Sequence, residues 1–130
     1  MRIRRGHPLW QRLVQGAAGR KYLNCPTEDG CGFRHPSKLQ ARVTDALRAR
    51  AKAVITEVSV PLSPRANDRI RIDALVIESV REDGSFIGRF VEVKGCDLAA
   101  GVQKRRRFED RYGVPIRVVY RLRDVDSVYL

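Results

Sequence analysis

Two apolar segments joined by a short acidic turn constrain the fold of this chain more than any other feature. One runs from Ile70 to Val80 and the other from Phe86 to Lys94. The intervening Glu-Asp-Gly-Ser contains Asp-Gly, which is a typical hairpin signal. The two segments are therefore predicted to be neighbouring antiparallel strands.

Three of the charged residues in these strands form a pattern that indicates chemistry. Alternate residues of a strand point to the same face, so Glu92 and Lys94 point the same way, and pairing of the strands sets Asp73 beside Glu92. Two carboxylates with a lysine suit a hard cation and metal-assisted hydrolysis of a phosphodiester. We expect Asp73, Glu92 and the backbone carbonyl of Val93 to bind Mg²⁺, or Mn²⁺ in its place. Lys94 is expected to orient the attacking water and to stabilise developing negative charge.

Simpler interpretations of the same residues stand beside this one. Asp73 can instead be an edge-strand aspartate paired with Arg71 or Arg89. Glu92 and Lys94 can form an exposed ion pair, which is worth under about 1 kcal/mol. A charged residue in so apolar a strand is nevertheless rare unless it is paired or bound to a metal, which favours the metal site.

The remaining pattern predicts helices around a sheet. Ser37 is a good N-cap for a helix and Gln40 stands at its third position, the spacing of a capping box. Further elements are predicted as a hairpin of segments 21–25 and 31–35, a strand over 54–62, a helix over 98–112 capped by Asp97 and ended by Gly113, a strand over 116–120, and a short strand or helix in the tail. The expected class is α/β, with a mixed central sheet flanked by helices.

Length and charge limit the other possibilities. The 130 residues suffice for one domain, which we place at 21–130, preceded by a basic arm at 1–20. The net charge of +11 comes mostly from arginine and indicates a polyanionic partner, most simply nucleic acid. A basic protein without such a partner is the plain alternative. Because no apolar run has the length of a membrane span and no signal peptide is recognisable, we expect no membrane association and a cytoplasmic location.

The Asp73, Glu92 and Lys94 pattern resembles the PD-(D/E)XK nuclease superfamily. Asp73 matches the family aspartate, Glu92 the (D/E) position and Lys94 the lysine. The helix-strand-strand-strand-helix-strand order between residues 37 and 120 is similar to the restriction-endonuclease-like core. Among its branches, the chain looks most like small phage nucleases and archaeal-type Holliday junction resolvases, and residues 32–41 resemble the hairpin-to-helix junction of the phage proteins.

The resemblance implies a metal-dependent, structure-selective DNA endonuclease, most simply a four-way junction resolvase of DNA recombination and repair. Resolution of a junction needs two symmetric cuts, so a homodimer with two-fold symmetry is expected. It would work in a bacterial, archaeal or phage-infected cell. The alternatives are a phage-type endonuclease that acts on flaps, nicks or duplex, and a DNA-binding relative with a weakened site.

One position departs from the family pattern. The family usually has a glutamate on the first helix, where this chain has Gln40. Gln40 can be a plain capping residue, a weakened ligand that binds metal through water, or an inactivating change. Glu57, on the following strand, is a candidate source of the missing carboxylate.

The helix after Glu-x-Lys supplies further candidates. In proteins that this chain resembles, that helix often lends a residue to the site, and Gln103 and Lys104 are the candidates here. The expected DNA contacts are basic or amide side chains: Lys38, Gln103, Lys104, Arg105, Arg106 and Arg107. A solvated basic face is the alternative for the arginines, although Arg105 falls inside the apolar face of the helix.

The cysteines are less informative. Cys25, Cys31 and His35 offer three of the four ligands of a structural zinc, with Cys96 as a distant fourth. Cys25 and Cys31 can equally be plain neighbours at a turn, or a pair that forms a disulfide on oxidation.

Overall fold

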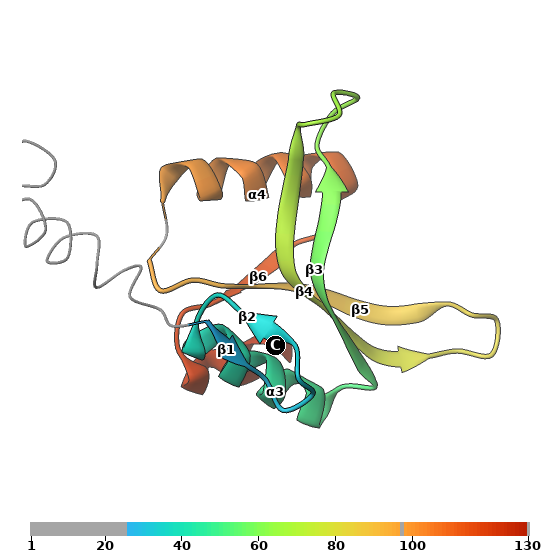
Figure 1. Cartoon of the computed structure of the whole chain (residues 1–130). Helices are drawn as coiled ribbons and strands as arrows, with labels where there is room; N and C mark the ends of the chain where they lie inside the picture. The colour runs from blue at the N-terminus through green and yellow to red at the C-terminus, as the bar shows by residue number, and fades with distance from the viewer. Residues whose placement is uncertain (1–25, 97, 130) are drawn as a thin grey trace, which may run out of the picture.

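A computed structural model describes residues 26–96 and 98–129 of the chain (Figure 1). The predicted basic arm at 1–20 and the segment 21–25 lie outside the described residues. The elements in chain order are β1 (Thr27–Glu28), β2 (Arg34–His35), α3 (Lys38–Arg50), β3 (Ala53–Pro61), β4 (Arg69–Val80), β5 (Phe86–Val93), α4 (Ala99–Tyr112), β6 (Ile116–Val119) and the 3-10 helix η2 (Leu122–Tyr129).

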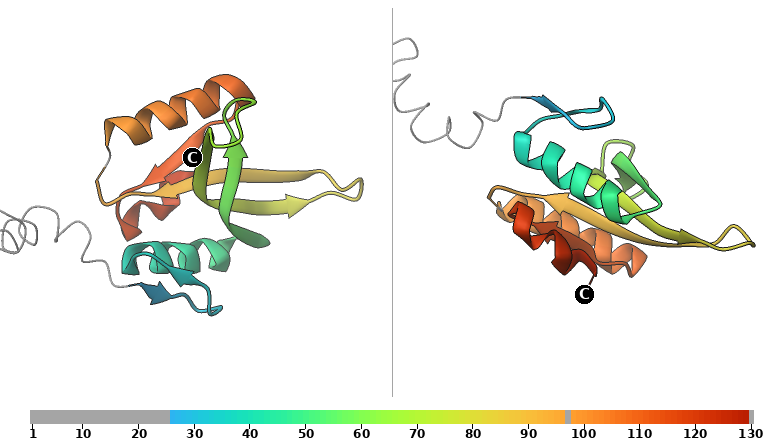
Figure 2. Two further views of the ribbon diagram at one scale, coloured as in Figure 1. Left: turned by 45° about the horizontal axis from the view of Figure 1, so that its top comes forward. Right: turned by 90° about the horizontal axis from the view of Figure 1, so that it is seen from below.

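Four strands form one mixed sheet in the order β3-β4-β5-β6. Strands β3, β4 and β5 pair antiparallel, whereas β6 runs parallel to β5 after the crossover through α4. The helices α3 and α4 lie on opposite sides of the sheet (Figure 2). The predicted α/β class, with a mixed sheet flanked by helices, is confirmed, as is the order from α3 to β6. No helix in the described part of the chain is long and apolar enough to cross a membrane.

Local signals account for the start of α3 and the end of α4. The Ser37 hydroxyl accepts a hydrogen bond from the Gln40 amide at 3.1 Å, as the predicted N-cap requires. Gly113 ends α4 with a φ of 67°, a left-handed conformation that glycine adopts without strain. The predicted cap of α4 is different, because its N-cap residue is Leu98 and no side chain caps it.

The first hairpin also differs from its prediction. Thr27 and Glu28, expected in the turn, form β1, and the turn follows them. Asp29 explains the shift, because its Oδ1 accepts hydrogen bonds from the amides of Cys31 and Phe33 and so fixes the turn after β1. In the tail, the helical alternative is correct, as η2.

Two clusters of buried side chains hold the layers together. One lies under α3 and η2 and includes Leu47, Val76 and Val91, while the other lies under α4 and centres on Phe108. Strand β4 contributes to both: Ala74 and Val76 belong to the first cluster, whereas Ile70 and Ile72 belong to the second. The same side of β4 therefore faces α3 at one end and α4 at the other, so the strand twists strongly between Ile72 and Ala74.

The hairpin β1–β2 is fastened to α3 by one buried carboxylate. The side chain of Asp29 is fully buried, and its Oδ2 lies 2.5 Å from His35 Nε2 and 2.7 Å from Arg48 Nη1. Burial raises the pKa of Asp29, but the hydrogen bonds from His35, Arg48 and the two backbone amides outweigh it and hold the pKa well below its usual range. Asp29 is therefore charged at neutral pH and contributes to stability.

Replacing Asp29 with alanine should lower the free energy of unfolding by about 3 kcal/mol, because it leaves the buried His35 without its partner and removes the nearest carboxylate from the partly buried Arg48. Since the pKa of Asp29 is depressed in the folded state, this contribution is lost as pH falls below the ordinary value of 3.8. Urea unfolding at pH 7 measures the difference. The exposed Glu82→Ala is the control, and an equal effect of both substitutions would contradict the anchoring role.

Candidate active site

The carboxylate of Asp73 lies where β4 separates from β5. The pair of the β4–β5 ladder farthest from the connecting turn is Ala74 with Val91. Extending the same register by one residue sets Asp73 opposite Glu92. At this level Asp73 Oδ2 accepts a hydrogen bond from the Val93 amide at 2.8 Å. The Lys94 amide donates to Val119 on β6, so the Val93 amide points to the β4 side and finds the carboxylate there. The alternative in which Asp73 is ion-paired with Arg71 or Arg89 is not observed among the described residues.

Glu92 is a buried carboxylate with two cations beside it. Its residue is only 4% exposed. Its Oε2 lies 3.3 Å from Arg105 Nη1 and 4.0 Å from Lys94 Nζ. The predicted convergence of Asp73, Glu92 and Lys94 is therefore present, and Arg105 joins it.

Burial sets the protonation of both carboxylates. It raises the pKa of Asp73, against the opposing effects of the Val93 amide, Lys94 and His35. It also raises the pKa of Glu92, to which the nearby charge of Asp73 adds, while Lys94 and Arg105 oppose it. Two carboxylates that are costly to ionise and lie side by side are stabilised when a further cation binds between them.

Gln40 contacts the site directly. Its residue is 7% exposed, and its Nε2 donates a hydrogen bond to Asp73 Oδ1 at 3.2 Å. Of the predicted capping box, only one hydrogen bond is present: the backbone amide of Gln40 donates to the hydroxyl of Ser37. The side chain thus links α3 to β4 at the carboxylate instead of closing a capping box.

Glu57 lies level with Asp73 on the other neighbouring strand. The flanking pairs Thr56–Ala74 and Val58–Ile72 set it opposite Asp73. Its φ of 57° is uncommon for a residue other than glycine inside a strand, and it marks the level at which the β3–β4 ribbon bends away from the sheet. The carboxylate of Glu57 contributes to the raised pKa of Asp73.

The carboxylates of the site suit Mg²⁺ that takes only some of its ligands from the protein. Within residues 26–96 and 98–129, no group of three His, Cys, Asp or Glu side chains is arranged to hold a metal ion. Asp73 and Glu92 alone would therefore supply the side-chain oxygens, and Glu57 does not complete a three-carboxylate site in this conformation. Mg²⁺ is commonly bound by one or two carboxylates, with waters and substrate phosphates as the other ligands.

The predicted residues of α4 have different surroundings. Arg105 is buried against Glu92, so its guanidinium faces the site instead of solvent. Lys104 Nζ donates to the Arg69 carbonyl at 3.3 Å, and Arg107 binds Asp68 with two hydrogen bonds. Gln103, Arg106 and, on α3, Lys38 are exposed. One feature of the sequence indicated that Arg105 is buried: it falls within the apolar face of the helix.

The candidate zinc ligands do not converge in the described residues. Cys25 lies outside them, Cys31 and Cys96 are exposed free thiols, and His35 is engaged with Asp29. Whether Cys25 and Cys31 pair on oxidation remains a prediction.

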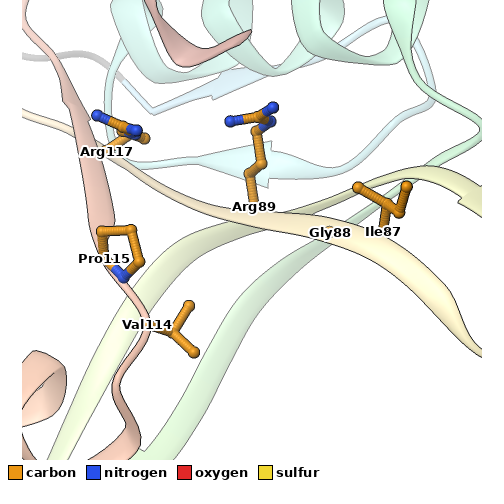
Figure 3. A pocket seen from close by; sticks show the side chains of 6 residues that line it. All are labelled: Ile87, Gly88, Arg89, Val114, Pro115 and Arg117. Atoms are coloured by element: carbon orange, nitrogen blue, oxygen red, sulfur yellow. The ribbon is translucent and has the colours of Figure 1, made fainter. Parts of the chain in front are cut away.

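A separate pocket of about 250 Å³ lies between β5 and the segment that leads into β6 (Figure 3). The guanidinium groups of Arg89 and Arg117 extend to the same side of the sheet there. The complete lining is Ile87, Gly88, Arg89, Val114, Pro115 and Arg117. None of the predicted site residues contributes to it.

A scan against protein-family models and searches of curated proteins and of solved structures found no match.

Asp73→Asn should raise the free energy of unfolding of the metal-free protein at pH 7. Because the folded-state pKa of Asp73 is raised, stability falls as pH rises from 3.8 through the folded-state pKa, and the neutral amide avoids that loss. The control Asp68→Asn should act in the opposite direction, since Arg107 lowers the pKa of Asp68 to about 2. Urea unfolding in EDTA compares the two variants, and a loss of stability in both would contradict the assignment.

Proposed function

We propose that this chain is a metal-dependent, structure-selective DNA endonuclease of the PD-(D/E)XK type, with the four-way junction as its favoured substrate. The observation that carries the proposal is the alignment of Asp73 with Glu92 across β4 and β5, with Lys94 Nζ beside Glu92. The helix and strand order from α3 to β6 is compatible with a restriction-endonuclease-like core.

Each side chain has a distinct task in this proposal. Asp73 and Glu92 would hold Mg²⁺, which when bound lowers the pKa of a water and screens the phosphate. Lys94, whose side chain is partly exposed, orients the water and stabilises negative charge on the phosphate. The Val93 amide and Gln40 fix the Asp73 carboxylate, and Arg105 fixes that of Glu92. Val93 is the predicted source of a backbone oxygen ligand.

The preference for branched DNA follows from size and charge. A chain of 130 residues has little room for a separate sequence-reading domain, and arginine-rich surfaces favour contacts to the phosphate backbone. Two symmetric cuts in one junction require two sites, so the active species is proposed as a homodimer with two-fold symmetry.

A second candidate function is DNA binding with a weakened nuclease site. Gln40 favours it, because the side chain that stands in place of the family glutamate donates a hydrogen bond to Asp73 and adds no charge. Cleavage in the presence of metal separates the two candidates.

The purified protein should make paired, symmetric cuts in an end-labelled four-way junction with Mg²⁺ and none with EDTA. Asp73→Asn and Glu92→Gln should each lower the cleavage rate at least about 100-fold, since each removes a charged ligand. The exposed Glu82→Gln, in the turn between β4 and β5, is the matched control and should cut normally. Tight binding of the junction without cutting in either Mg²⁺ or Mn²⁺ would instead support the weakened relative.

Gln40→Glu should have opposite effects on stability and on turnover. The new carboxylate would face Asp73 Oδ1, so the metal-free protein should lose stability, whereas saturating Mg²⁺ should recover it. If position 40 reaches the metal, the cleavage rate should increase severalfold. Thermal unfolding with and without Mg²⁺, together with the cleavage rate, measures both effects, and an unchanged rate would leave Gln40 a capping and positioning residue.

A further inference from the structure

The outer face of the β3–β4 ribbon carries two arginines that form no ion pair with a described acidic residue. Arg69 and Arg71 alternate along β4 with Ile70 and Ile72, which belong to the cluster around Phe108 under α4. The two arginines therefore face away from α4 and are exposed. Across residues 26–96 and 98–129, no ion pair involves either of them.

Arg69 is bound to the residue of β3 that pairs in register with Arg71. Arg71 is paired in register with Ser59, and Arg69 donates to Ser59 through Nε, at 2.9 Å to Oγ, and through Nη2, at 3.1 Å to the carbonyl. Like charges side by side on a sheet are unfavourable without an anion between them. The hydrogen bonds to Ser59 nevertheless hold Arg69 in place, so at least this charge is preorganised for an anionic ligand.

Side chains of α4 support the ribbon from its other side. Arg107 binds Asp68 at the ribbon tip, Lys104 reaches the Arg69 carbonyl, and the Tyr112 hydroxyl donates to the Pro61 carbonyl at 2.5 Å. Figure 1 shows the end of the ribbon where β3 joins β4 beside α4, whereas the turn between β4 and β5 lies away from it. The arginine face is thus held rigidly relative to the sheet.

The arginines lead to the candidate active site. Alternate residues of a strand are about 6.7 Å apart, so the Cα of Arg69 lies about 13 Å along β4 from that of Asp73, with Arg71 midway. A strand of duplex DNA advances about 3.4 Å per phosphate, so this distance corresponds to about four nucleotides. One polyanion can therefore contact both arginines while one of its phosphates lies at Asp73 and Glu92.

We infer that Arg69 and Arg71 form the track that binds the DNA strand on one side of the phosphodiester that is cut. This inference rests on the proposed nuclease function for the position of the cut, but the binding surface itself can be tested alone. It adds phosphate contacts on the ribbon to those predicted on α4, where Arg105 and Arg107 are engaged with Glu92 and Asp68.

Binding of labelled duplex DNA, measured by fluorescence anisotropy in EDTA over a series of salt concentrations, tests the track without cleavage. The double variant Arg69→Gln/Arg71→Gln should bind at least about tenfold more weakly, because two charge-assisted contacts are lost. The slope of log K against log salt should decrease by about 1.8, the value for two phosphate contacts. The double variant Arg81→Gln/Arg123→Gln removes the same charge at exposed positions elsewhere and should change the affinity little.

The outcomes separate this inference from the proposed function. Equal binding by the two double variants would overturn the track even if the protein cuts DNA. Weaker binding by the ribbon variant alone would support the track as a DNA surface even if no cleavage occurs. Competition by a polyglutamate peptide as effective as by DNA would also overturn it, since the face would then bind any polyanion.

A second experiment places the track relative to the cut. Neutral methylphosphonate linkages would replace single phosphates within about four nucleotides of the cleaved bond, on each side in turn. Substitutions on one side should weaken binding by the intact protein and have little effect on the ribbon double variant. The same loss for both proteins at every position would contradict the inference.

Discussion

The architecture depends on the point at which β4 separates from β5. From Ala74 to Val80 strand β4 pairs antiparallel with β5, with one shift of register between Ile77 and Ser79, whereas before Ala74 it pairs with β3 alone. The amide of Val93 would be left without a strand partner there, and the Asp73 carboxylate accepts its hydrogen bond. Because Gln40 of α3 binds the other oxygen of Asp73, this one carboxylate joins three elements at the bend.

The separation of β4 from β5 also positions the two carboxylates of the candidate site. Asp73 and Glu92 are adjacent at a level where no further ladder bonds form, so their carboxylates are held by the fold and raised in pKa by burial. Lys94 and Arg105 offset the charge of Glu92, whereas Asp73 has hydrogen bonds and, within the described part of the chain, no ion pair. A bound divalent cation would relieve this imbalance, which is the physical basis of the proposed metal site.

Sequence patterns were sufficient where the signal was local. The Asp-Gly turn marked the pairing of β4 with β5, and Ser37 and Gly113 marked helix ends. The turn alone does not set Asp73 opposite Glu92, because the register of the two strands shifts by one residue between Ile77 and Ser79. Sequence patterns misplaced the first turn, because its position depends on hydrogen bonds from the backbone to the side chain of Asp29. Exposed charge was ambiguous on α4, because only the fold shows that Arg105 and Arg107 meet carboxylates while Arg69 and Arg71 do not.

Binding of a divalent cation by Asp73 and Glu92 can be measured by electron paramagnetic resonance of Mn²⁺. The wild-type chain should bind Mn²⁺ with an affinity that rises with pH, as protons leave the two carboxylates. Glu92→Gln should abolish that binding, while Glu82→Gln should leave it unchanged. Mn²⁺ binding of equal affinity in the wild-type protein and in Glu92→Gln, or none in the wild-type protein at any pH at which it is folded, would contradict the account.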